Sequence, residues 1–228
     1  MVRILILNCD YDPNPRTNGA RLLKRQAAAA GISNISIKNI LKGAKVTDSD
    51  VLSSDAVLIT GSRASAYERK KWIRYLGGLI RKLDSAHIPV LGVCFGFQIA
   101  AQSLGGAVDR AVTGEEGFGP VTLTPAGRID WLFEGVPPQF HVYQSHNDVV
   151  TALPKGARKL ASNRHSIQAY SLREFRCVQF HPEIGIGTAR AMALRDGRDT
   201  TEALNGLNPG DTMHYRVISN FLLRLKKK

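Results

Sequence analysis

A short apolar segment runs directly into a cysteine that is flanked by two glycines. Residues 88–91 (IPVL) are typical of a strand, Gly92 and Gly96 stand two residues either side of Cys94, and residues 99–104 favour a helix. Glycines at these two positions permit the sharp strand-to-helix turn of a nucleophile elbow. Backbone amides and the dipole at a helix N-terminus favour an anion, so Cys94 is a candidate thiolate nucleophile.

Short apolar segments alternate with helical segments along the first half of the chain. We expect strands at residues 3–8, 35–40, 55–60 and 88–91, and helices at 19–30, 67–83 and after Cys94. Strands separated by helices of ten or more residues are typical of an α/β fold, with a mostly parallel central sheet flanked by helices. Active sites in such sheets lie at the carboxyl ends of the strands, where Gly61, Ser62 and Cys94 fall.

The second half of the chain has a different pattern. Four strand-like segments follow one another without clear helices between them, at residues 121–124, 140–143, 168–172 and 175–180. We therefore expect antiparallel strands added at one side of the sheet. Helices are expected at 188–194 and 213–225, with an irregular segment at 195–211 between them. No repeat or linker divides the chain, which predicts a single domain over residues 1–228.

Composition narrows the possible classes of function. The formal net charge of +12 invites a nucleic-acid reading, but the basic residues are scattered and do not alternate with aromatic residues, so we expect an ordinary solvated basic surface. No segment reaches the ~20 apolar residues that span a bilayer, which predicts a cytoplasmic protein without a membrane partner. The three cysteines are far apart in sequence, which predicts neither a disulfide framework nor a metal site, and no cofactor motif is found.

A cysteine nucleophile also needs a base and a carboxylate that orients it. His181 ends the last strand-like segment and is followed by Pro182 and Glu183. The proline restricts the backbone, which can hold imidazole and carboxylate in a fixed relation. A lone histidine at a strand end is more often bonded to a backbone carbonyl, so the hypothesis depends on its combination with Cys94.

Residues 92–98 (GVCFGFQ) and 178–183 (VQFHPE) together resemble the two signature blocks of the class I glutamine amidotransferases, and 87 residues separate Cys94 from His181, as in that family. The resemblance covers most of the chain. It implies that Cys94 is the nucleophile, that His181 is the general base and then the acid, and that Glu183 holds the imidazole.

The same resemblance extends to two further elements of the site. Thr60, Gly61 and Ser62 resemble the family's oxyanion turn, so that a backbone amide of Gly61 or Ser62 would act together with that of Phe95. Gln98 matches a glutamine that family members place in the substrate pocket.

Residues 144–148 resemble the Ser-His-x-Asp segment of the family, whose backbone holds the α-amino group of the substrate. This implies a substrate-binding role for Ser145 and His146, whereas Asp148 is more simply a turn residue. Residues 114–119, with Glu115 and Glu116, resemble the family's glutamate–glycine segment beside the pocket, in a register that the sequence leaves open.

The resemblance implies hydrolysis of the side-chain amide of L-glutamine through a thioester. No nucleotide-binding motif is present, so the ammonia would pass to a separate ATP-dependent synthetase subunit. The chain is most similar to stand-alone members that resemble the GMP synthetase glutaminase subunit, some of which are γ-glutamyl peptidases. One alternative is therefore a γ-glutamyl peptidase or hydrolase that acts on γ-glutamyl conjugates, and a non-enzymatic alternative is a regulatory module that has kept the fold.

Phe97, an uncommon residue at its position, indicates either a different leaving group or helix packing, and we favour packing.

Overall fold

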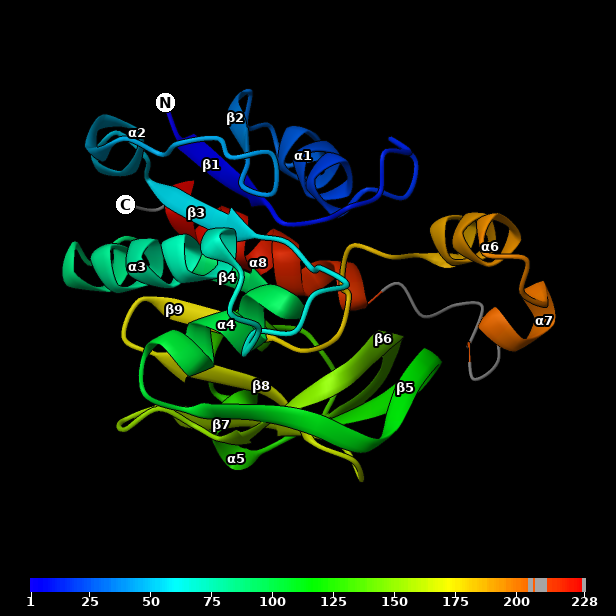
Figure 1. Ribbon diagram of the computed structural model, residues 1–228. Coiled ribbons are helices and arrows are strands. Elements are labelled where there is room, and N and C mark those ends of the chain that lie inside the picture. The colour runs from blue at the N-terminus through cyan, green and yellow to red at the C-terminus, as the bar shows by residue number, and fades with distance from the viewer. Residues whose placement is uncertain (205–206, 208–212, 227–228) are drawn as a thin grey trace.

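The computed structural model describes residues 1–204, 207 and 213–226, and the strands in that part of the chain form one sheet (Figure 1). Its nine strands lie in the order β2-β1-β3-β4-β9-β8-β7-β5-β6. The first five in this order run parallel to one another: β2 (Asn34–Asn39), β1 (Arg3–Asn8), β3 (Ala56–Ile59), β4 (Val90–Val93) and β9 (Phe175–Val178). The predicted parallel centre of an α/β sheet is confirmed.

The remaining four strands are antiparallel to their neighbours and extend the sheet beyond β9, as predicted: β8 (Ile167–Leu172), β7 (Arg158–Ser162), β5 (Ala107–Leu123) and β6 (Gln139–Ala152). β5 and β6 form one hairpin and are much longer than the predicted segments 121–124 and 140–143. Many residues of β5 are exposed and its pairing is irregular between Arg110 and Glu115, so the apolar alternation that marks a strand is weak there.

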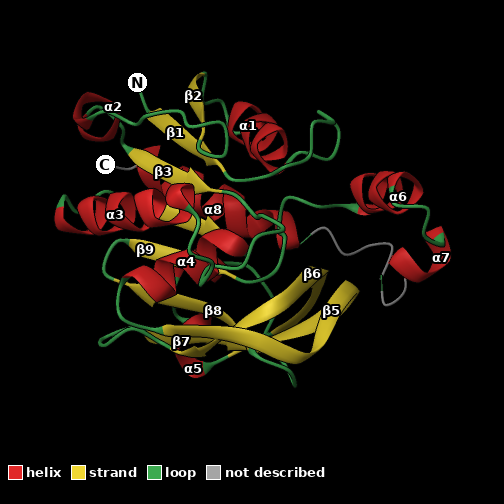
Figure 2. Ribbon diagram, in the orientation of Figure 1, coloured by secondary structure: helices red, strands yellow, loops and turns green. Residues whose placement is uncertain are grey.

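Helices cover both faces of the parallel centre (Figure 2). The described helices are α1 (Gly19–Ala29), α2 (Asp48–Leu52), α3 (Lys71–Ser85), α4 (Phe95–Ser103), α5 (Pro125–Arg128), α6 (Ile186–Arg195), α7 (Thr200–Ala203) and α8 (His214–Lys226), with a 3₁₀ turn at Trp131–Phe133, and α1, α3, α4 and α8 are the ones that pack on the parallel centre. α3 starts at Lys71 rather than at the predicted residue 67, because Ser65 to Glu68 close a hydrogen-bonded turn before it. No helix in the described part of the chain is both long and apolar enough to cross a membrane.

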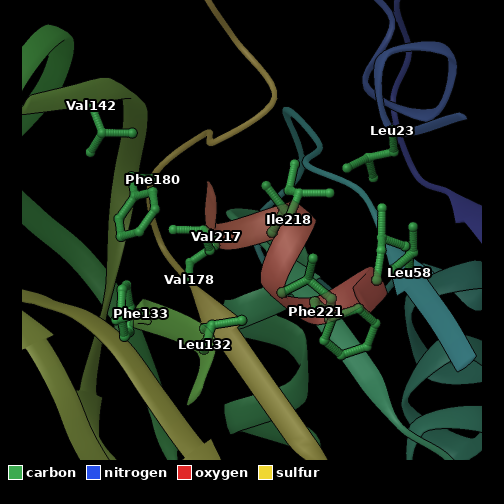
Figure 3. Close-up of a cluster of buried hydrophobic side chains, with 14 of the residues drawn as sticks. Leu23, Leu58, Leu132, Phe133, Val142, Val178, Phe180, Val217, Ile218 and Phe221 are labelled. Atoms are coloured by element: carbon green, nitrogen blue, oxygen red, sulfur yellow. The ribbon is translucent and has the colours of Figure 1, made fainter. Parts of the chain in front are cut away.

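The buried parallel strands explain why their sequences are continuously apolar. In β1, Ile4 and Ile6 face the side covered by α1 and α8, whereas Leu5 and Leu7 face α3 and α4. Successive side chains of a strand point to opposite faces, so a strand covered on both sides needs apolar residues at every position. Figure 3 shows the α8 side of this core, where Ile218 and Phe221 lie near Leu58 of β3.

The segment after α6 is only partly as predicted. Residues 195–211 were expected to be irregular, but α7 lies within them, and residues 205–206 and 208–211 fall outside the described part of the chain. α6 and α7 lie to one side of the helix layers in Figure 1, where α7 contacts β5. The end of α6 lies near the carboxyl end of β1, because Arg195 pairs with Asp12 in the loop that follows that strand.

Candidate active site

Cys94 stands alone between β4 and α4, and the predicted order of strand, turn and helix is present. Its φ and ψ are 52° and −101°, a conformation that L-residues rarely adopt. A Cβ on Gly92 would lie 2.7 Å from the carbonyl oxygen of Gly96, and a Cβ on Gly96 would lie 2.5 Å from that of Ile59. The turn therefore requires glycine at both positions, and the Cys94 side chain at its apex is only 3% exposed.

His181 and Glu183 lie beside this turn although they come from the far end of the chain. The His181 N–H donates to the Tyr143 carbonyl over 2.9 Å, which joins the residue to β6, and His181 Nδ1 lies 2.8 Å from Glu183 Oε1. A Cβ on Gly61 would lie 3.0 Å from His181 Cε1 and 3.6 Å from the Cys94 Cβ. The imidazole and the thiol thus flank the same glycine.

The charge state of His181 follows from these neighbours. Burial disfavours the imidazolium, but the Glu183 carboxylate and Cys94 outweigh it and raise the pKa of His181 well above 6.5. The ring nitrogen bonded to Glu183 is Nδ1, so Nε2 is the nitrogen left to exchange a proton with the thiol or a substrate.

The turn after β3 presents backbone amides at the same place. Within the described residues, the N–H groups of Gly61 and Ser62 donate to no other protein atom. The Thr60 hydroxyl accepts the Cys9 N–H over 2.9 Å and donates to the Gly61 carbonyl over 3.0 Å, which fixes the turn to β1. Phe95 is the first residue of α4, where the N–H has no partner within the helix.

Gln98 and Ser145 also lie near Cys94, Gln98 through its side-chain amide and Ser145 through its backbone carbonyl. The Gln98 Nε2 donates to the Asp148 carbonyl over 2.9 Å and to Gln179 Oε1 over 3.2 Å, so this amide connects α4 to β6 and to the end of β9. The Ser145 carbonyl accepts from Cys94 Sγ over 3.7 Å. The backbone of Ser145, as the family resemblance implies, is the part that faces the site.

The two glutamates of residues 114–119 have different surroundings in the structure. The buried His146 ring lies with Nε2 3.3 Å from Glu115 Oε2, and Glu115 Oε1 accepts from Asn163 over 2.6 Å. Burial opposes ionisation of Glu115, but His146 and Asn163 lower the pKa of its carboxyl below the ordinary value. Glu116 instead pairs with Arg198, so Glu115 is the one of the two glutamates that lies beside His146.

All the predicted site residues except Phe95 line one cavity of about 900 Å³ at the carboxyl ends of the parallel strands. In the sheet, β4, whose end carries Cys94, lies between β1 and β3 on one side and β5 and β6 on the other, so the lining residues fall into two groups. The first group, called the inner residues, comes from α4, β5 and β6: Gln98, Arg110, Glu115, Ser145, His146 and Asp148. The second group, called the outer residues, comes from the loops after β1 and β3 and from the end of α6: Asp10, Asp12, Arg63, Arg195, Asp196 and Arg198.

A sequence model of the family described as glutamine amidotransferase class-I matches residues 19–199. The chain belongs to the class I glutamine amidotransferases. γ-Glutamyl peptidase 4 of Arabidopsis thaliana is 34% identical over 200 residues, which are 81% of this chain and 80% of that protein. A glutamine-hydrolysing GMP synthase of Syntrophomonas wolfei is 36% identical over 132 residues, which are 57% of this chain but 24% of the synthase.

Solved structures of glutamine amidotransferases share the fold. A protein of Thermotoga maritima superposes with a TM-score of 0.81 at 23% identity, over 100% of this chain and 99% of its own. A protein of Methylobacillus flagellatus gives 0.82 at 19% identity, over 99% and 94%. The fold class predicted from the alternating segments is confirmed.

Phe97 has a packing role in this amidotransferase. Its side chain is fully buried, and its ring centroid lies 5.1 Å from that of Tyr170, whose hydroxyl donates to the Phe97 carbonyl over 3.2 Å. Phe97 is not among the residues that line the cavity. The departure at this position therefore belongs to the core between α4 and β8.

Sequence reasoning missed the charged residues at the outer part of the cavity. Asp10 and Asp12 follow β1 directly, and the rule that pointed to Cys94 at the carboxyl end of a strand could have found them. The sequence contains no comparable pattern that points to Arg195 and Arg198. They reach the cavity because α6 ends beside it, a placement that depends on packing across the whole domain.

Replacing Glu183 with glutamine is expected to lower the pKa of His181, because burial then acts on the imidazolium without the carboxylate that offsets it. The wild-type ring should keep its proton above pH 6.5, and the variant ring should release it at lower pH. NMR of the labelled His181 Cε1–H between about pH 5 and 9 measures both values directly. The exposed Glu134→Gln exchange is the control, and identical titrations of His181 in wild type and Glu183→Gln would contradict the assignment.

Proposed function

We propose that this amidotransferase-family chain is a cysteine-dependent hydrolase of γ-glutamyl amides, with its site contained in one domain over residues 1–228. Cys94 is the nucleophile, His181 the general base and then the general acid, and Glu183 the carboxylate that orients the imidazole. The observation that carries this proposal is the convergence of Cys94 and His181 on Gly61, with Glu183 Oε1 2.8 Å behind the ring. Triads are recognised by such geometry and roles rather than by sequence order.

The reaction follows from the placement of these groups. The Cys94 thiolate adds to the γ-carbonyl carbon, and the carbonyl π electrons move to the oxygen. The N–H groups of Phe95 and of Gly61 or Ser62 stabilise this oxyanion, since no group among the described residues competes for them. As the intermediate collapses, His181 protonates the departing nitrogen, the C–N bond breaks and a thioester remains. His181 then takes a proton from water, which attacks the thioester and regenerates the thiol with release of glutamate.

The inner group of cavity residues is suited to the glutamyl part of the substrate. The Ser145 carbonyl can accept from the α-ammonium group, next to the His146–Glu115 pair, and Gln98 forms the wall beside them. These residues lie on the α4–β6 side of Cys94, opposite the outer residues on the β1 and β3 loops. The bound glutamyl group would therefore place the carbon of its γ-carboxyl group near Cys94 and its α-carbon near β6.

The size of the cavity favours a γ-glutamyl conjugate as substrate over free glutamine. At about 900 Å³, the cavity is at the upper end of the range of sites that enclose ligands much larger than one amino acid. The Arabidopsis γ-glutamyl peptidase matches over 80% of its length, which supports the same choice. A glutaminase subunit that passes ammonia to a separate synthetase is the second candidate, supported by the match to about a quarter of the GMP synthases.

Product release from two substrates by the purified chain tests the proposal. We expect release of glycine from γ-glutamylglycine without any partner, at a higher kcat/KM than release of ammonia from L-glutamine. Enzyme alkylated at its thiol beforehand supplies the blank. Turnover of glutamine that starts only when an ATP-dependent synthetase is added would favour the second candidate, and no turnover of either substrate under both conditions would refute the proposed hydrolase.

A further inference from the structure

The outer part of the cavity lies on the side from which the leaving amine must depart. His181 has to reach the departing nitrogen to protonate it, so the leaving group occupies the space next to His181. Asp10 lies close enough to His181 for the two charges to interact, and Asp12, Arg63 and Arg195 line the same region. An ammonia molecule needs almost none of this volume. A larger amine would contact these charged residues.

Three arginines reach this outer region, but two of them are already engaged. Arg195 forms an ion pair with Asp12, and Arg198 forms one with Glu116 over 2.5 Å. Arg63 differs from both. Its side chain is 72% exposed, and its one ion pair within the described residues is a 3.6 Å contact with Asp196.

The Asp196 contact leaves most of the Arg63 donors unused. Both carboxylate oxygens of Asp196 already accept from Arg195, each over 2.8 Å, so the more distant Arg63 is the weaker partner. A guanidinium has five N–H donors in a planar fork that matches a carboxylate in a bidentate pair. Arg63 also follows Ser62 directly, so its side chain starts one residue from the amide assigned to the oxyanion.

We propose that Arg63 binds a carboxylate carried by the leaving amine, so that the preferred substrates are γ-glutamyl amino acids and γ-glutamyl peptides. This inference rests on the proposed hydrolase. The glutamyl part cannot supply this carboxylate, because its α-carbon is placed at the opposite end of the cavity, toward β6. The smallest amine that carries a carboxylate next to the scissile bond is an amino acid.

Two substrates that differ only in this carboxylate test the proposal. We expect wild type to hydrolyse γ-glutamylglycine with a higher kcat/KM than γ-glutamylmethylamide. Both substrates have a secondary amide and the same glutamyl part, but the amine of the methylamide carries no carboxylate. Arg63→Ala should lower kcat/KM for γ-glutamylglycine by about 10- to 100-fold, the size of a lost charge-assisted hydrogen bond, and should change that for the methylamide by less than about twofold. Arg63→Lys should recover part of the preference, because it restores the charge without the fork.

The matched control is Arg74→Ala, which removes an exposed arginine of α3 outside the cavity and should leave both substrates unchanged. Equal losses for the two substrates in Arg63→Ala, or an unchanged ratio, would overturn the role of Arg63 while leaving the hydrolase intact. If wild type turned over neither substrate, the proposed function itself would fail, and this inference with it.

Discussion

Replacing Cys94 with alanine is expected to lower kcat for γ-glutamylglycine by about 10⁴-fold or more, the usual loss when a covalent nucleophile is removed. The remaining amides of the oxyanion turn can still polarise the carbonyl, but no thioester can form. Steady-state rates together with mass spectrometry of a substrate-trapped enzyme measure both effects. The variant should remain folded, since the sulfur hydrogen bonds of Cys94 with the Ser145 carbonyl and with Gln179 are long, at 3.7 and 3.8 Å.

The other two cysteines provide the controls for this prediction. Cys9 and Cys177 are fully buried, and burial raises the pKa of both thiols, that of Cys177 to about 12. Iodoacetamide at neutral pH should therefore label Cys94 in the native protein and neither of the others. Cys177→Ala should retain activity. A Cys94→Ala enzyme that kept a rate near that of wild type would exclude covalent catalysis by this thiol.

The parallel half of the fold was predictable because its inner strands are buried on both faces, although the edge strand β2 is partly exposed. In Ala56–Ile59 and Val90–Val93 every residue is buried, so the apolar run and the strand coincide. The β5–β6 hairpin lacks that signal. Val112 in β5 is fully exposed, and the pairing is irregular between Arg110 and Glu115. Neither a continuous apolar run nor an alternation of apolar and polar residues therefore marks this strand in the sequence.

The residues of the candidate site also differ in how well the sequence predicts them. Cys94 could be predicted because the elbow is a local event, in which glycine spacing, strand and helix lie within a dozen residues. His181 needed the combination of two motifs. Arg63 could not be found from the sequence, because its significance depends on Asp196 and Arg195 at the end of α6, more than 100 residues further along the chain.

The same distinction applies to Gln98 and His146. Both were predicted as substrate-pocket residues, and both line the cavity. The sequence could not show that the Gln98 amide is also bonded to the Asp148 carbonyl, or that Glu115 is the partner of His146. The Glu115–His146 pair depends on the register of β5 against β6, in which these two residues are opposite each other, and a weak strand signal does not determine that register.

The second prediction concerns the free energy of unfolding and depends on the close contact between α4 and β3. Gly96 packs directly against the carbonyl group of Ile59, and the backbone of Gly92 faces the backbone of Gly96 across the elbow. Backbone atoms cannot move aside as a flexible side chain can. An added methyl group must therefore push the start of α4 away from the sheet, together with the Cys94 turn and the Phe95 amide.

Replacing Gly96 with alanine is expected to lower the free energy of unfolding by about 2–3 kcal/mol, because the overpacking cost exceeds the ~1 kcal/mol gain in helix propensity. Denaturant titration measures the change as a shift of the midpoint at constant slope. The matched control is Gly187→Ala in α6, where the new Cβ meets nothing within 4 Å. That exchange should be neutral or stabilising by up to ~1 kcal/mol. Equal effects of the two exchanges would show that the contact with Ile59 does not constrain the elbow.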